Sequence, residues 1–122
     1  MKKQESAVVI GYSGHSYVIL KELTLQNISV KGYFDFEEKK TNPYNLKYLG
    51  VESSDQIKNH SDCSFYICIG ENSIRKKIFQ ILGGKDTPNL ISKNSTCFLK
   101  SIGIANFIGT QTIINPEVEI GN

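Results

Sequence analysis

The stretch "AVVIGYSGHSYVI", residues 7–19, indicates how the first part of the chain folds. It opens with an apolar, β-branched run, which suits a strand buried on both faces of a parallel sheet. Glycines and serines follow, and apolar residues then recur at helical spacing from Gly14 to about Gln26. We therefore predict a strand at 7–12, a tight turn and a helix. The turn leaves three interpretations open: a phosphate cradle, a site for a catalytic histidine, or a simple connection.

The alternation of strand and helix patterns continues to residue 82. Strands are predicted at 28–36, 48–53 and 64–70, and helices at 54–59 and 72–82. Such an alternation is typical of a parallel α/β sheet with right-handed connections. We predict a small Rossmann-like sheet with flanking helices, which occupies residues 1–87. In the last helix, the spacing places these residues inward: Ile74, Ile78, Ile81 and Leu82.

The pattern changes in residues 88–122, where the helical spacing ends. Ile102, Ile108, Ile114 and Ile120 recur at intervals of six, each followed by glycine or asparagine. This spacing resembles a hexapeptide repeat, which builds a parallel β-helix by stacking one aliphatic side chain on each short face. We therefore predict the first coil of a left-handed parallel β-helix, incomplete at Asn122, and expect this sequence to be the front of a longer protein. An irregular β-hairpin packed on the sheet is the alternative.

Composition excludes several classes of function. A net charge of +2 over 122 residues, without a block of Lys and Arg, argues against a nucleic-acid partner. The apolar runs are too short for membrane insertion, and the N-terminus lacks a signal-peptide pattern, so a cytoplasmic protein is expected. The cysteines lack CxxC spacing, so no metal site is expected, and Cys68 reads as a small buried hydrophobe.

Candidate binding residues follow three predicted strands. The first turn has Gly11-x-x-Gly14 spacing, not the GxGxxG dinucleotide fingerprint, but it still opens a helix whose N-terminus favours an anion. Ser13 can donate a hydroxyl there, and Gly14 permits close approach of a ligand. Asp35 comes 21 residues after Gly14, where nucleotide-binding α/β folds place an acid for a ribose hydroxyl. Asp35 could instead only bond its own loop.

Five more residues near these strand ends are candidates for contact or for a purely structural role. Gly70 permits close approach at the third strand end, and Asn72 could bind a ligand or cap the following helix. His15 suits a contact with a phosphate or sugar, with packing or turn stabilisation next and catalysis last. His60 reads as an exposed turn residue, and Arg75 as part of a solvated helix face.

The segments "VVIGYSGHSYVI", "GYFDFE" and "ICIGENSIRKKI", followed by the hexapeptides, resemble one family across essentially the whole chain. It is the family of bacterial sugar acetyltransferases with an N-terminal nucleotide-sugar-binding domain and a C-terminal left-handed β-helix. The resemblance assigns nucleotide-sugar contacts to Ser13, Gly14, His15 and Asp35. Phe36 stands where members often carry a second acid, and we include it in the predicted substrate-binding set with Gly70 and Asn72.

The resemblance also implies chemistry that this sequence does not hold. Members use acetyl-CoA, bound between the subunits of a homotrimer, and a catalytic histidine in the β-helix, expected here beyond Asn122. A uridine-linked nucleotide sugar is the expected ligand, and the isolated chain is expected to be inactive. The alternative is a non-enzymatic nucleotide- or CoA-binding module whose tail mediates oligomerisation. A dinucleotide-dependent oxidoreductase is disfavoured by the glycine spacing and the hexapeptides.

Overall fold

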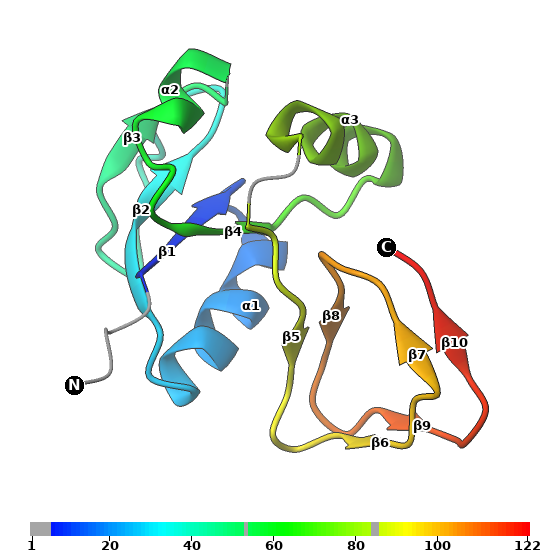
Figure 1. Ribbon diagram of the computed structural model, residues 1–122. Coiled ribbons are helices and arrows are strands. Elements are labelled where there is room, and N and C mark those ends of the chain that lie inside the picture. The colour runs from blue at the N-terminus through cyan, green and yellow to red at the C-terminus, as the bar shows by residue number, and fades with distance from the viewer. Residues whose placement is uncertain (1–5, 53, 84–85) are drawn as a thin grey trace. The chain divides into compact units, whose positions relative to one another are not determined.

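The computed structural model describes residues 6–52, 54–83 and 86–122, and the chain divides into two compact units, Met1–Thr87 and Pro88–Asn122 (Figure 1). The first unit contains four strands and three helices in the predicted order. They are β1 (Ser6–Ile10), α1 (Gly14–Leu25), β2 (Ser29–Phe34), β3 (Tyr48–Gly50), α2 (Ser54–Lys58), β4 (Ser64–Ile67) and α3 (Asn72–Leu82).

The four strands form one parallel sheet with the order β3-β2-β1-β4. β1 lies between β2 and β4, so its residues have protein on both sides and on both faces. Ala7, Val8, Val9 and Ile10 are all fully buried, as their uninterrupted apolar run predicts. The α/β prediction is confirmed for this unit.

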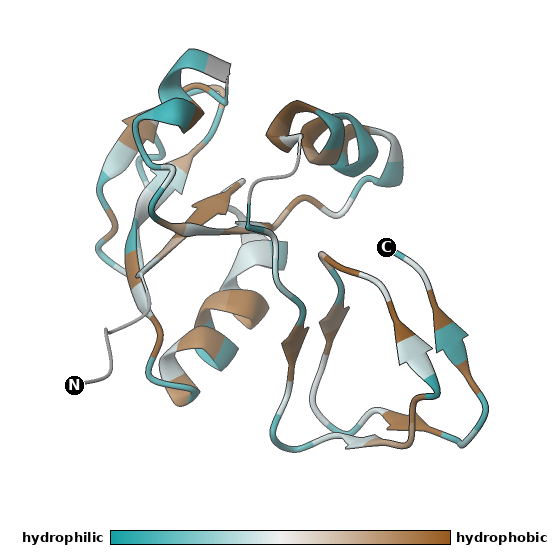
Figure 2. Cartoon of the chain, in the orientation of Figure 1, coloured by the Kyte–Doolittle hydropathy of each residue, from teal (hydrophilic) through white to brown (hydrophobic). Residues whose placement is uncertain are grey.

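Helices cover both faces of the sheet (Figure 1). Val8 and Ile10 point to the face where a buried cluster includes Ile57 of α2 and both Ile78 and Leu82 of α3. Alternate residues of β1 point to the opposite face, on which α1 lies. Its buried residues there are Ile19, Leu20 and Leu23. In Figure 2, β1 is coloured hydrophobic and α2 largely hydrophilic, in keeping with a buried strand and a surface helix.

The predicted inward face of α3 is half wrong. Ile78 and Leu82 are buried, but Ile74 and Ile81 are 42% and 40% exposed. The part of α3 that packs against the core is a narrow stripe formed by Ile78, Leu82 and the partly buried Phe79. The hydrophobic spacing alone predicts a wider buried face. His60 lies in a turn, as predicted, but it is half-buried and not exposed, and its ring meets the Phe34 ring edge-on at 5.6 Å between centroids.

The second unit consists of six two-residue strands: β5 (Leu90–Ile91), β6 (Thr96–Cys97), β7 (Ser101–Ile102), β8 (Phe107–Ile108), β9 (Ile113–Ile114) and β10 (Glu119–Ile120). Each of the last three pairs in parallel with the strand three elements earlier, so β5 pairs with β8, β6 with β9 and β7 with β10. The chain therefore returns on itself once every 17 or 18 residues. The four regularly spaced isoleucines each occupy the second position of one strand.

The corners of this coil also recur every six residues. Ala105, Gln111 and Glu117 have φ angles of 62°, 60° and 69°, in the left-handed region that non-glycine residues rarely adopt. Asn106 bonds the neighbouring turn, since its Nδ2 donates to the Gly121 carbonyl at 2.6 Å. Within the described ranges, no helix has the length and apolar character that crossing a membrane requires.

Candidate functional site

All four parallel strands end at one edge of the sheet, and a cleft of about 260 Å³ lies across these ends. Every strand contributes residues from the segment that follows it. We call this the strand-end cleft. It is lined by Gly11, Ser13, Asp35, Phe36, Lys39, Glu52, Cys68, Ile69, Gly70 and Ile74. Ligands of open α/β sheets bind at this edge, beside the point where the strand order reverses.

A second, larger hollow adjoins the start of α1. This outer cleft, of about 570 Å³, is lined by Tyr12, Ser13, Gly14, Tyr17, Glu37, Glu38, Lys39, Lys40 and Thr41. Ser13 and Lys39 line both clefts, so the two are contiguous at these side chains. The pair offers room for a ligand with two connected parts.

The predicted site residues divide between these hollows. Ser13, Asp35, Phe36 and Gly70 line the strand-end cleft, and Gly14 lines the outer cleft. His15 and Asn72 line neither. His15 is exposed, and a Cβ built on Gly70 would lie 3.8 Å from its Cγ, so the first turn of α1 borders the end of β4.

Asn72 does not cap α3. Glu71 occupies the N-cap position with extended backbone, and Asn72 is the first helical residue. Arg75, read as part of a solvated face, is instead half-buried, and its Nη1 donates to the Ile67 carbonyl at 2.6 Å. The guanidinium thus binds the last carbonyl of β4.

Two glycines of the first turn have different reasons to be glycine. Gly11 has a φ of +94°, and a Cβ there would lie 2.8 Å from Ile69 Cγ1, so the fold itself requires glycine. A Cβ on Gly14 would meet no protein atom within 4 Å. The space beside Gly14 is therefore open to a ligand.

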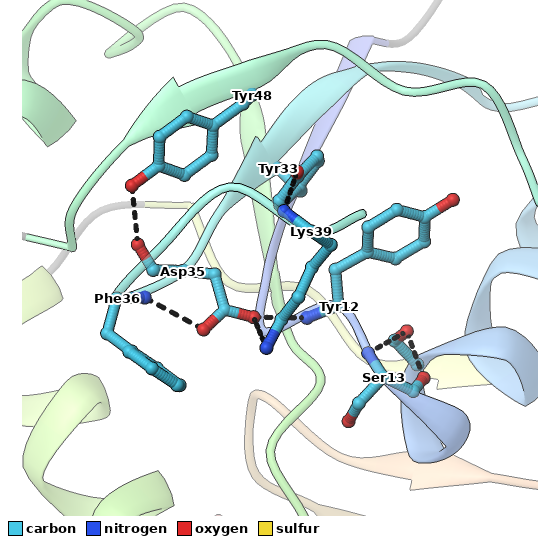
Figure 3. Close-up of polar contacts among 8 residues, drawn as sticks. Tyr12, Ser13, Tyr33, Asp35, Phe36, Lys39 and Tyr48 are labelled. Carbon is cyan, nitrogen blue, oxygen red and sulfur yellow. Dashed lines mark hydrogen bonds and ion pairs between the residues drawn. The ribbon is translucent and has the colours of Figure 1, made fainter. Parts of the chain in front are cut away.

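Asp35 ties the two central turns together (Figure 3). Its Oδ2 accepts a hydrogen bond from the Tyr12 amide at 2.9 Å, and its Oδ1 accepts one from the Phe36 amide at 2.8 Å. The Lys39 ammonium lies 3.7 Å from Oδ2. Asp35 is only 8% exposed, and its two oxygens are used to hold the backbone that shapes the cleft.

Lys39 is a cation that the sequence analysis did not single out. Its ammonium lies beside Asp35 and 4.7 Å from the centre of the Phe36 ring. Its backbone amide donates to the Tyr33 hydroxyl at 2.8 Å. The one sequence signal for Lys39 is its place in the charged segment "FEEKK", residues 36–40, which begins shortly after the end of β2.

Hydrogen-bonded tyrosines fix the loop that carries Lys39. The Tyr12 hydroxyl donates to Asn42 Oδ1 at 2.7 Å and accepts from the Tyr44 amide at 2.9 Å. The Tyr44 hydroxyl donates to the Tyr17 carbonyl at 3.2 Å. Burial raises the pKa of Tyr12, which keeps its hydroxyl protonated and able to donate. The loop is thereby attached to α1 and to the turn that follows β1.

Cys68 forms part of the wall of the strand-end cleft but is not a reactive thiol. It is 1% exposed, as its place in an apolar run predicts, and burial raises its pKa to about 12. The Cys68 side chain is therefore a thiol, not a thiolate, at neutral pH. Across the described ranges, no three His, Cys, Asp or Glu side chains gather as a metal site requires.

Replacing Asp35 tests its role in holding the two turns. In Asp35→Asn, one carboxylate oxygen becomes an NH₂ group, so either the Tyr12 or the Phe36 amide loses its acceptor. We expect the free energy of unfolding to fall by about 1–3 kcal/mol in urea denaturation. The exposed Asp55→Asn in α2 is the matched control, with an expected loss below about 1 kcal/mol. Equal stabilities of the two variants would contradict this role.

The raised pKa of Cys68 predicts a pattern of chemical labelling. A pKa of about 12 leaves about one thiolate in ten thousand at pH 8. Iodoacetamide should therefore modify the half-buried Cys97 of the folded protein well before Cys68, as read by peptide mass spectrometry. Unfolding in urea should make the two equally reactive. Fast modification of native Cys68 below pH 9 would show that its pKa is not raised.

Comparison with known proteins bears on both units. The chain resembles the uncharacterized protein L142 of Acanthamoeba polyphaga mimivirus, with 31% identity over 112 residues, which is 89% of this chain and 22% of that protein. Its fold resembles a mutant of perosamine N-acetyltransferase from Caulobacter crescentus, solved with CoA and GDP-perosamine (TM-score 0.82, 19% identity, 96% of this chain and 57% of that one). It also resembles the acetyltransferase domain of PglB from Neisseria gonorrhoeae FA1090 in complex with acetyl coenzyme A (TM-score 0.78, 16% identity, 98% and 60%).

The chain thus spans about a fifth of the curated relative and less than two thirds of each solved chain. At these identities the solved structures show the fold, and the family is shown by a separate match. The model of the PglD N-terminal domain matches residues 6–82, which include all four strands of the sheet and both clefts. The chain belongs to the PglD N-terminal domain family.

Proposed function

We propose that this chain is the nucleotide-sugar-binding part of an acetyl-CoA-dependent sugar acetyltransferase for bacterial surface glycans, acting in the cytoplasm. The observation that carries the proposal is the pair of contiguous clefts at the strand ends, joined at Ser13 and Lys39. A nucleotide sugar has two bulky parts connected by a diphosphate, and this arrangement fits such a shape. Family membership and the fold shared with two acetyltransferases support it.

The chemistry of the junction suits a diphosphate. Ser13 supplies a hydroxyl, Lys39 a positive charge, and the first turn of α1 backbone N–H groups whose dipole favours an anion. The open space beside Gly14 lets phosphate oxygens approach that backbone. We place the nucleoside in the strand-end cleft, which is about the size of a nucleoside, and the sugar towards the outer cleft.

The seven predicted substrate-binding residues take different parts in this proposal. Ser13, Gly14, Phe36 and Gly70 contact ligand from the clefts, while Asp35 acts chiefly by holding the turns. His15 is available at the rim for a phosphate or sugar contact, and Asn72 at the start of α3 is the weakest member. The base stays open between uridine, expected from the sequence resemblance, and guanosine, which the C. crescentus neighbour carries.

The acyl-transfer chemistry is proposed to lie outside these 122 residues, in the part of the related chains that this one does not span. There a histidine would take a proton from the sugar amine or hydroxyl as it attacks the thioester of acetyl-CoA. We further propose that the coil of residues 88–122 begins a left-handed β-helix of hexapeptide repeats and that the complete enzyme is a homotrimer. The isolated chain should bind nucleotide sugar without transferring acetyl groups.

Calorimetry with UDP- and GDP-linked sugars tests this proposal. The chain should bind at least one of them, and Gly14→Val should weaken that binding at least about tenfold, since its side chain fills the space a phosphate would need. The thermal midpoint should change little, because a Cβ at this position meets no protein atom within 4 Å. Gly121→Val is the matched control, because a Cβ there also meets open space, but in the second unit.

Absence of binding to every nucleotide sugar tried would refute the proposed function. Binding that Gly14→Val leaves unchanged would place the ligand elsewhere on the chain. Acetyl transfer by the 122-residue chain alone would contradict the proposed location of the catalytic base.

A further inference from the structure

Glu52 is the one carboxylate of the strand-end cleft that has a buried oxygen without a hydrogen-bond partner among the described residues. It follows β3, the edge strand of the sheet, and lines the cleft. Its Oε2 is buried and has no hydrogen-bond partner among the described residues. Asp35, in the same cleft, has an amide donor for each oxygen. A buried acceptor without a donor costs free energy, so a native structure that keeps one calls for an explanation.

Exposed apolar surface lies in the same cleft. Phe36 is 67% exposed and Ile74 is 42% exposed, although both line the cleft. Lys39 lies over the Phe36 ring, which leaves the opposite face of the ring uncovered by that cation. Large exposed hydrophobic side chains at the wall of a cleft suit a flat apolar ligand surface.

Together these features describe a receptor for a flat ring with hydrogen-bond donors on its edge. An ionised carboxylate only accepts hydrogen bonds. Guanine offers two adjacent donors, N1–H and the 2-amino group, which match the two oxygens of one carboxylate. Uracil offers a single N–H between two carbonyl oxygens, and these would face the carboxylate as like partial charges.

We propose that Glu52 is a specificity residue which reads the base of the bound nucleotide and favours guanine over uracil. The inference rests on the proposed function, because it needs a nucleotide in the strand-end cleft. Phe36 and Ile74 form the apolar wall against which the base lies. The Glu52 carboxylate accepts hydrogen bonds from the N1–H and 2-amino groups at the edge of the base. The ligand would thereby supply a donor to the carboxylate whose Oε2 lacks a partner among the described residues.

The test is calorimetry of the 122-residue chain with GDP, UDP and inosine diphosphate, which lacks the 2-amino group. The wild-type chain should bind GDP at least about tenfold more tightly than UDP, with inosine diphosphate between them. Glu52→Gln should lose about tenfold or more in GDP affinity and change UDP affinity by less than about threefold. Glu119→Gln, an exposed site in the second unit with the same charge change, should behave as the wild-type chain.

Phe36→Ala is a second variant, which remains informative even if Glu52→Gln fails to fold. The Phe36 side chain is 67% exposed, so its removal should leave the fold intact. This variant should weaken GDP and UDP alike by about tenfold, since stacking on an aromatic ring does not read the base. The thermal midpoint of ligand-free Glu52→Gln should not fall, because Oε2 has no partner to lose.

The outcomes separate this inference from the function on which it rests. Equal affinity of the wild-type chain for GDP and UDP, or unchanged GDP binding by Glu52→Gln, would overturn the base-reading role and leave the proposed function standing. Equal loss of GDP and UDP affinity in Glu52→Gln would assign the carboxylate to the ribose, which both nucleotides share, and would also overturn it. No binding of any nucleotide by the wild-type chain would overturn both.

Discussion

The Asp35 carboxylate is the constraint on which the shape of the site depends. It accepts one amide hydrogen bond from the turn after β1 and one from the loop after β2, and it lies beside the Lys39 ammonium. A buried carboxylate is tolerated when hydrogen bonds and a nearby cation compensate for its lost hydration. The two neighbouring strand ends are therefore held at a fixed separation, and the floor of the strand-end cleft is formed before any ligand arrives.

The rest of the site depends on the loop between β2 and β3, which begins at Asp35. The loop between β2 and β3 has no regular secondary structure, yet hydrogen bonds through Tyr12 and Tyr44 attach it to the sheet and to α1. This attachment brings Lys39 to the junction of the two clefts. Glu52, one strand farther out, has a buried oxygen without such a partner among the described residues. Asp35 therefore shapes the cleft, whereas we propose that Glu52 contacts the ligand.

Most of the fold could be predicted from the sequence because buried parallel strands and stacked coils leave simple patterns. An apolar run such as residues 7–10 has few other readings, and isoleucines six apart mark successive short strands. The six-residue spacing did not reveal the strands that end at Ile91 and Cys97, because Cys97 and Ile102 are five positions apart and not six. The site was harder to predict from the sequence, because only the conformation of the loop after β2 brings Lys39 to the cleft. The spacing of apolar residues also could not show that Ile74 lines the cleft and not the core.

Amide chemical-shift mapping of the ¹⁵N-labelled chain, titrated with GDP and separately with UDP, tests the central claim that the strand ends of the first unit hold the nucleotide. We expect the largest shifts at the ends of the four parallel strands and in the segments that follow them, residues 11–14, 35–39, 50–52 and 68–70. Residues 88–122 should move little. The absence of shifts with both nucleotides, or shifts concentrated in the second unit, would contradict it.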